Sequence, residues 1–124
     1  MNNGTYVGIV FKRMIIDIRK TMSLIKEIDS AQGICKVTFI VPAEIAKEFK
    51  NINIVGDFNY WDIHVNPMKE TNEDGSKFIA LELPLNNEYE FKYFCDGNTW
   101  LNEPDADEFV PVAFESSFNS LITL

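Results

Sequence analysis

The amino-acid sequence predicts an all-β fold, an antiparallel β-sandwich, for residues 34–124. Three observations support this prediction: short runs of apolar residues that fit strands, turn residues between those runs, and no regular alternation of strands with helices. Short strands with frequent turns are typical of sandwiches, whereas a parallel sheet needs a crossover connection between successive strands. We expect strands at residues 36–41, 52–55, 78–83, 89–95 and 118–124.

The run at residues 89–95 has the clearest strand pattern. Phe91, Tyr93 and Cys95 occupy every second position, and successive side chains of a strand point to opposite faces of the sheet. If these three side chains face the core, Lys92 faces solvent from a rigid strand. The residues that we expect to lie mostly inside the sandwich are Phe39, Ile54, Leu81, Phe91 and Tyr93.

Residues that tolerate positive φ separate the predicted strands. Asp74 and Gly75 precede the run at residues 78–83, and Asp96 and Gly97 follow the run at residues 89–95. Asp, Asn and Gly favour tight turns because they adopt left-handed backbone conformations at low cost. These turns agree with short strands that follow one another closely.

The residues before the sandwich carry a different pattern. Apolar side chains recur there at spacings of three and four, which predicts an amphipathic helix over residues 14–29 that ends before Gly33. We therefore divide the chain into a partly helical extension, residues 1–33, and the sandwich, residues 34–124. Three interpretations of the helix stay open: it docks to a partner, it packs on its own domain, or the true start of translation lies further along the chain. The apolar residues of the stripe are Met14, Ile15, Ile18, Met22, Ile25 and Ile28.

The charge of the chain restricts its partners. With 19 acidic and 11 basic residues, the net charge is −8, so neither a phosphate backbone nor an anionic membrane surface is an expected partner. A neutral polysaccharide meets no such repulsion. Charged residues interrupt the apolar run near the amino terminus, which is a poor match to a signal peptide, and we expect a cytoplasmic protein.

The two cysteines, Cys35 and Cys95, lie in apolar runs. One disulfide between them is an alternative, but we interpret them as buried, reduced thiols, because a free cysteine behaves as a small apolar residue. The sequence contains no CxxC motif and no Cys/His cluster. We therefore expect no zinc site and no cofactor.

Several other polar residues are typical of a solvated surface. The only histidine, His64, has no obvious partner, so we place it in a surface loop. An acidic cluster follows the last tryptophan, and calcium is conceivable there, but the spacing of an EF-hand is missing and a solvated loop is the simpler interpretation. The cluster consists of Glu103, Asp105, Asp107 and Glu108.

Three segments carry the residues that indicate a function. A predicted strand leads into a loop at residues 55–61, a strong strand leads through an Asp-Gly turn to a second tryptophan at residues 89–100, and a polar loop enters the final strand at residues 114–120. Together they supply two indoles, a lysine ammonium and an asparagine amide. These groups suit a sugar, because the C–H faces of glucose pack on indole rings and its hydroxyls need directional partners.

These segments resemble carbohydrate-binding module family 48. That family includes the glycogen-binding domain of the AMP-activated protein kinase beta subunit and the amino-terminal (early set) domains of isoamylases and glycogen branching enzymes. The resemblance covers about residues 34–124 and implies an immunoglobulin-like sandwich that binds glycogen or starch. Its core is Gly-Asp-Phe-Asn-x-Trp at residues 56–61, Tyr-x-Phe-Lys-Tyr-x-x-Asp-Gly-x-x-Trp at residues 89–100, and Asn-Ser at residues 119–120.

The resemblance also implies roles for individual residues. Trp61 and Trp100 match the two tryptophans that stack on sugar rings, and Lys92 matches a lysine that donates hydrogen bonds to the sugar. Asn119 matches the polar residue of the last strand that contacts sugar hydroxyls.

Two further residues are implied as sugar contacts near the final strand. Phe114 takes the place of an apolar residue at the edge of the sugar site, and Ser117 that of a hydroxyl contact. The sequence departs from the family here, because related modules often have a glycine-rich stretch where this chain has residues 115–118. The extension at residues 1–33 is not part of the family's pattern either.

The expected function is non-catalytic binding of an α-glucan polysaccharide or a maltooligosaccharide. The module would then target or regulate a separate carbohydrate-active enzyme or another protein. A hydrolase is not expected, because the barrel that hosts this chemistry in the relatives needs about 250 residues, and the chain has 124. The alternative is an immunoglobulin-like protein-interaction module that has lost sugar binding, since one fold hosts many functions.

Overall fold

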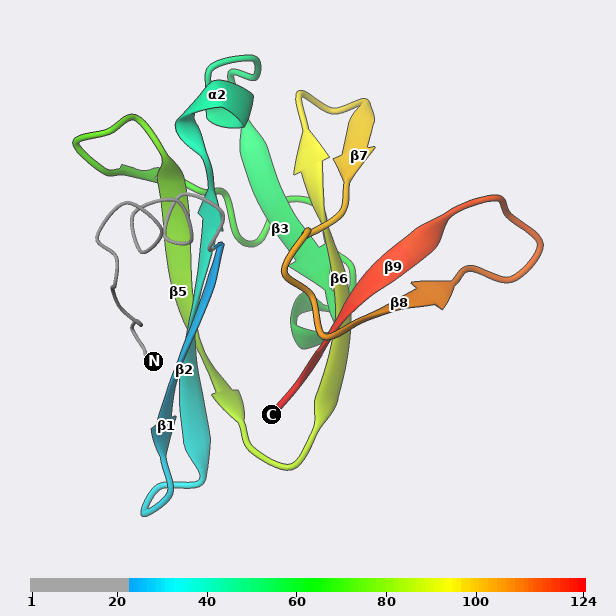
Figure 1. Ribbon diagram of the computed structural model, residues 1–124. Helices are drawn as coiled ribbons and strands as arrows, with labels where there is room; N and C mark the ends of the chain where they lie inside the picture. Colours follow the sequence, from blue (N-terminus) through cyan, green and yellow to red (C-terminus); the bar gives the residue numbers. More distant parts are fainter. Residues whose placement is uncertain (1–22) are drawn as a thin grey trace, which may run out of the picture.

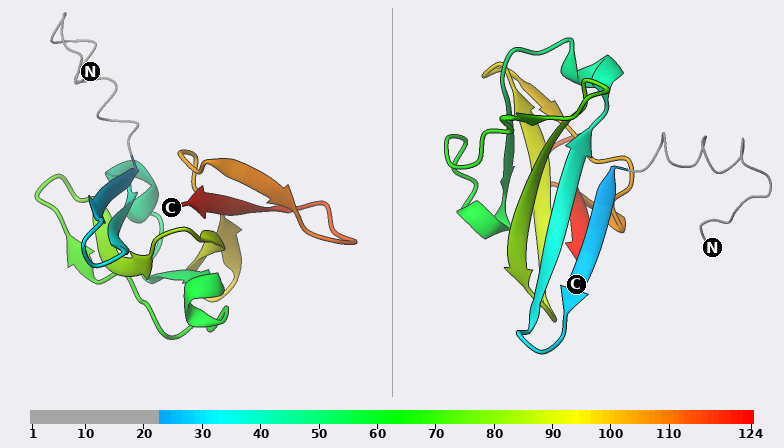
Figure 2. Two further views of the ribbon diagram at one scale, coloured as in Figure 1. Left: turned by 90° about the horizontal axis from the view of Figure 1, so that it is seen from below. Right: turned by 90° about the vertical axis from the view of Figure 1, so that its left-hand side faces the viewer.

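The computed structural model describes residues 23–124 and shows two antiparallel sheets in two layers (Figures 1 and 2). The predicted all-β sandwich is thereby confirmed. The first sheet has the strand order β1 (Leu24–Asp29), β2 (Ile34–Val41), β5 (Lys77–Pro84), β4 (Glu70–Thr71). The second has the order β3 (Ile52–Gly56), β6 (Glu88–Cys95), β9 (Phe118–Thr123), β8 (Glu108–Pro111), and β7 (Thr99–Leu101) also pairs with β6. Two short helical turns, α2 (Ala43–Ala46) and η1 (Asp57–Asn59), flank β3.

All five strands predicted from sequence are present, as β2, β3, β5, β6 and β9. The strands that the sequence pattern missed are β1, β4, β7 and β8. Three of these are only two to four residues long, which is too short to show an alternation of apolar and polar residues. The β8–β9 hairpin projects from the side of the molecule, as the orange and red strands of Figure 1 show.

The helix predicted over residues 14–29 is wrong where the structure describes it. Residues 24–29 form β1, which pairs with β2 from Leu24 opposite Phe39 to Asp29 opposite Ile34. A tight turn ending in Gly33, whose φ is +69°, folds β1 back on β2, and the backbone pairing overrides the helical spacing of Ile25 and Ile28. The predicted domain boundary between residues 33 and 34 falls inside this hairpin, between its turn and β2, so the sandwich begins before that boundary and includes β1. The remainder of the predicted helix lies outside the described residues.

The core lies between the two sheets and is built from alternating strand positions. Phe39, Ile54, Phe91 and Tyr93 are buried as predicted, and Leu81 is partly buried against them. The rings of Phe39 and Phe91 pack edge to face with centroids 5.2 Å apart, which is a favourable aromatic geometry. Within residues 23–124, no helix is long and apolar enough to span a bilayer.

Both cysteines are buried free thiols, as the sequence indicated. Burial, together with the neighbouring charge of Asp96, raises the pKa of the Cys95 thiol to about 11. The thiol therefore stays protonated near neutral pH and acts as a small apolar side chain of the core.

The acidic cluster differs from its predicted solvated state, because Glu103 is completely buried. The Tyr93 hydroxyl donates to Glu103 Oε1 at 2.6 Å, and the Asp105 N–H donates to Oε2 at 2.9 Å. The Ser23 hydroxyl also donates to Oε2, and the Glu103 N–H donates to Ser120 Oγ at 2.9 Å. A carboxylate in the interior is tolerated because its hydrogen-bonding capacity is satisfied in this way.

The other members of the cluster lie at the surface. Asp107 pairs with Lys26 at 2.8 Å and accepts the Thr123 N–H, so it connects β1 to the last strand. Among residues 23–124, no group of three or more His, Cys, Asp or Glu side chains is arranged to hold a metal. His64 is exposed, as expected.

The buried network leads to a prediction about stability. Burial and the charge of Glu103 raise the pKa of Tyr93 well above its ordinary value, so its hydroxyl remains a donor. Tyr93→Phe removes this donor and should lower the free energy of unfolding, measured with urea, by about 1–3 kcal/mol. Tyr89→Phe is the matched control, because the Tyr89 hydroxyl bonds to the Pro84 carbonyl at the surface. Equal losses in the two variants would contradict the role assigned to the network.

Candidate functional site

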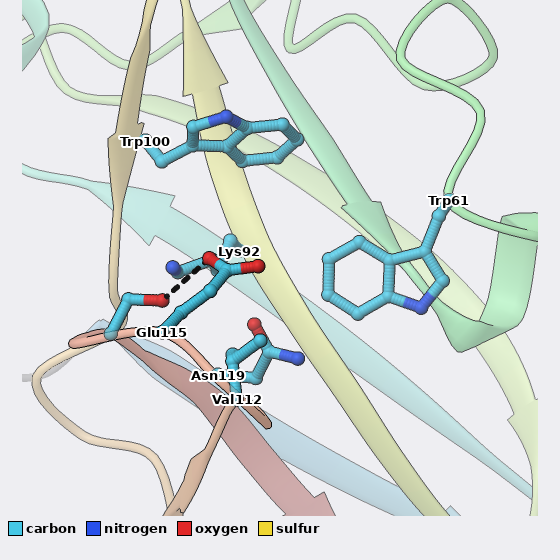
Figure 3. A pocket seen from close by; sticks show the side chains of 7 residues that line it. Trp61, Lys92, Trp100, Val112, Glu115 and Asn119 are labelled. Carbon is cyan, nitrogen blue, oxygen red and sulfur yellow. Dashed lines mark hydrogen bonds between the residues drawn. The ribbon is translucent and has the colours of Figure 1, made fainter.

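An open depression of about 320 Å³ lies on the outer side of the second sheet. It is lined by five of the six site residues predicted from sequence, namely Trp61, Lys92, Trp100, Ser117 and Asn119. In Figure 3, the Trp100 indole lies in front of strand β6, which carries Lys92, and the Trp61 indole lies to one side of that strand. The depression thus brings together three segments that are far apart in the chain.

The sixth predicted residue, Phe114, does not line the depression. It is fully exposed at the tip of the β8–β9 hairpin, with a φ of +64°. Two residues that the prediction missed, Val112 and Glu115, line the depression instead. Recognition of the β8–β9 hairpin in the sequence would have pointed to both residues, because its loop carries them. Strand β8 is too short for the sequence pattern to reveal this hairpin.

Gly56 ends β3 at a point where the backbone of β6 comes very close. A Cβ atom at this position would lie 2.4 Å from the Glu90 carbonyl oxygen and 2.6 Å from the Phe91 Cβ atom. These distances are far below ordinary contact, so only glycine permits this approach of the two strands. The loop that carries Trp61 therefore starts against the surface of β6.

Asn59 stabilises the turn from within. Its side chain is buried, its Oδ1 accepts the Gly56 N–H at 2.9 Å, and its Nδ2 donates to the Ile54 carbonyl at 3.0 Å. The same nitrogen donates to Asn66 Oδ1 at 2.9 Å, which connects the two ends of the loop. A buried side chain with three such bonds is well determined in position.

Asp57 connects the turn to β6 and to the indole. Its Oδ2 accepts the Glu90 N–H at 2.7 Å, and its Oδ1 accepts the Trp61 indole N–H at 2.9 Å. The carboxylate therefore positions the indole relative to the sheet. Charge-assisted hydrogen bonds of this kind are stronger than those between neutral groups.

Tyr60 and Trp61 both adopt the left-handed conformation, with φ values of +57° and +58°. The Trp61 N–H donates to the Gly56 carbonyl at 2.9 Å, which closes the turn. Two consecutive left-handed residues that are not glycine are unusual and cost free energy. Such strain persists only where the surroundings fix it, and it is frequent at functional sites.

Trp100 is held by the hairpin after β6. Asp96 and Gly97 turn the chain with positive φ values, and β7 then pairs Trp100 opposite Phe94. The two rings lie 4.3 Å apart at an interplanar angle of 35°, and the indole remains 44% exposed. Phe94 thus supports one side of the indole while the other side stays accessible.

Lys92 and Asn119 line the depression from two adjacent strands, β6 and β9. Phe91 and Tyr93 are buried, so Lys92 points outward as the strand pattern predicted. The Asn119 side-chain amide donates to Glu90 Oε1 at 3.0 Å, which orients it beside β6.

The β8–β9 hairpin supplies the remaining polar wall. The Val112 N–H donates to the Ser117 carbonyl at 3.0 Å and closes the loop. The Ser117 hydroxyl donates to Glu115 Oε1 at 3.3 Å, as the dashed line in Figure 3 shows.

The depression offers two accessible aromatic faces and a mixed set of donors and acceptors. Among residues 23–124, the ion pair between Lys26 and Asp107 is the only one within 4.0 Å, so Lys92 and Glu115 do not pair with each other. An ammonium and a carboxylate are therefore both available to a ligand that has hydroxyl groups. No protein-family model matches the chain, and no curated protein matches it significantly.

The close approach at Gly56 leads to a second prediction. Gly56→Ala places a methyl group against the β6 backbone and should lower the free energy of unfolding by about 3 kcal/mol. Gly33→Ala is the matched control, because its new methyl group meets open space and only the positive φ costs about 1 kcal/mol. Urea unfolding of both variants measures the difference. A loss at Gly56 no larger than that at Gly33 would show that the close approach is not a constraint.

Proposed function

We propose that this protein is a non-catalytic module that binds neutral α-glucan chains, such as glycogen, starch or maltooligosaccharides, in the depression between Trp61 and Trp100. The observation that carries the proposal is the arrangement of these two indoles around Lys92 and Asn119 on one open surface. The resemblance to carbohydrate-binding module family 48 names the same residues. On this proposal, the module brings a separate carbohydrate-active enzyme to the polysaccharide or regulates it.

The aromatic groups suit a curved sugar chain. The Trp100 indole packs against the ring of Phe94, and the Asp57 carboxylate fixes the orientation of Trp61, so both rings are positioned before a ligand arrives. Sugar rings have apolar C–H faces that pack on such surfaces. Preorganised rings also lose little conformational freedom on binding.

The polar groups suit the hydroxyls at the rim of the chain. Lys92 supplies donors, Glu115 supplies acceptors, and Ser117 and Asn119 can do both. A net charge of −8 disfavours polyanionic ligands, whereas a neutral glucan is unaffected. Each stacking contact and each net hydrogen bond contributes about 1–1.5 kcal/mol, and a hydrogen bond to a charged group such as the Lys92 ammonium contributes about 1.5–3 kcal/mol. Four such groups on an open surface correspond to a dissociation constant between about 10 μM and 1 mM.

The carboxylates support a binding role over hydrolysis. Most glycoside hydrolases place two carboxyl groups on either side of the bond that they cleave. Among the residues that the structure describes, the lining of the depression includes one carboxylate, that of Glu115, and so lacks a second carboxyl group to form such a pair. The nearby Glu90 does not line the depression, and its carboxylate accepts a hydrogen bond from the Asn119 amide. We therefore expect binding of the sugar without release of reducing ends.

The third prediction tests the proposed site with Trp100→Ala. This variant should bind maltoheptaose at least tenfold more weakly, because it loses one stacking surface, while circular dichroism shows an unchanged fold. Lys92→Ala should weaken binding less. Phe109→Ala is the matched control, because Phe109 is a similarly exposed aromatic residue that does not line the depression.

Isothermal calorimetry and retention on a glycogen gel provide the two measurements. If the unmodified protein neither binds maltoheptaose nor is retained on glycogen, the proposed function is wrong. The protein-interaction module then takes its place.

A further inference from the structure

A second open depression, of about 410 Å³, lies beside the loop that carries Trp61 and is separate from the first in its lining. Its aromatic and polar residues include Tyr60 and Asn66 from the loop and Glu82 from β5, and its apolar lining includes Phe58, Val65 and Leu81. The volume falls within the range of about 300–1,000 Å³ that is usual for small-ligand sites.

Tyr60 is the distinctive residue of this depression. Its side chain is 93% exposed, and its backbone has the left-handed φ and ψ values of +57° and +30°. Glycine or asparagine would adopt this conformation at lower cost. The ring of Tyr60 is almost entirely in solvent, so contacts of the ring within the protein do not offset the free-energy cost of the left-handed backbone. A large aromatic residue at such a position is therefore better explained by contact with a ligand.

One turn serves both depressions. Tyr60 and Trp61 are consecutive, yet Tyr60 lines the second depression and Trp61 lines the first. The hydrogen bonds of Asn59 hold the backbone of this turn and so fix the positions of both residues. The turn thus presents an aromatic side chain to each of two neighbouring surfaces.

The second depression also has hydrogen-bonding groups that a sugar can use. Asn66 Oδ1 accepts the bond from Asn59, and the amide nitrogen of Asn66 has no protein partner among the described residues. Strand β4 pairs with β5 only at Lys77 and Phe78, so within residues 23–124 the edge of β5 is free beyond that point. Alternate residues of a free edge direct their N–H and C=O groups away from the sheet. Three residues of this edge, Leu81, Glu82 and Leu83, line the depression.

We propose that the depression beside Tyr60 is a second binding site for the same class of ligand, a neutral α-glucan chain. The proposal rests on the proposed function of the first site. An aromatic ring, a free amide, a carboxylate and backbone groups together match the mixed chemistry of a sugar. The shared turn favours a sugar over an extended peptide strand, which is the other occupant that a free sheet edge could take. Two sites on one module would increase the retention of long chains well beyond that of short ones.

The test is a titration of the isotope-labelled full chain with maltoheptaose, followed by NMR of the backbone amides. Two groups of signals should shift, one near Lys92 and Asn119 and one near Val65 and Asn66. Tyr60→Asn should raise the dissociation constant obtained from the second group of signals at least fivefold and leave that of the first group unchanged, because asparagine keeps the left-handed turn but lacks the ring. Trp100→Ala should raise the dissociation constant obtained from the first group and leave that of the second group unchanged. Phe109→Asn is the control that should change neither.

The outcomes separate this inference from the proposed function. Shifts confined to the group near Lys92 would overturn the second site while the first stands. A second group that responds equally in the wild type and in Tyr60→Asn would also overturn it. The absence of any shift would overturn both, and the free edge of β5 would then point to a peptide partner.

Discussion

The contact between the end of β3 and the backbone of β6 determines much of the structure. Gly56 permits an approach that no other residue allows, and Asp57 then connects the loop to β6 through the Glu90 N–H and to the indole of Trp61. The position of Trp61 relative to Lys92 follows from this contact, because the loop begins against the strand that carries the lysine. The strained turn at Tyr60 and Trp61 is a consequence of the same arrangement.

The remaining parts of the site depend on β6 as the central strand of its sheet. β6 pairs with β3, β7 and β9, so each neighbour brings one part of the site to its outer face. The turn at Asp96 and Gly97 positions Trp100, and β9 positions Asn119. Successive side chains of β6 point to opposite faces of the sheet, so Lys92 points outward because Phe91 and Tyr93 point into the core. The same alternation therefore determines both the core residues and the site residue of this strand.

The parts of the structure that sequence reasoning predicted are those with a local physical signal. Alternation identified β6 and the outward Lys92, and the turn residues identified the hairpin to Trp100. The strand β1 was mistaken for a helix because an edge strand shows no strict alternation, and its pairing with β2 depends on contacts outside its own residues. The burial of Glu103 depends on donors distant in the chain, such as Tyr93 and Ser23, which no spacing rule reveals.

The measurement that tests the account most directly is a double-mutant cycle on maltoheptaose binding with Asp57→Ala and Trp61→Ala. On the proposed function, Asp57 acts on the ligand through the indole, so Asp57→Ala should weaken binding in the presence of Trp61 but have little further effect in its absence. The double variant should therefore bind as weakly as Trp61→Ala alone, with circular dichroism confirming that each variant is folded. Additive losses, or full binding by Asp57→Ala, would contradict the account.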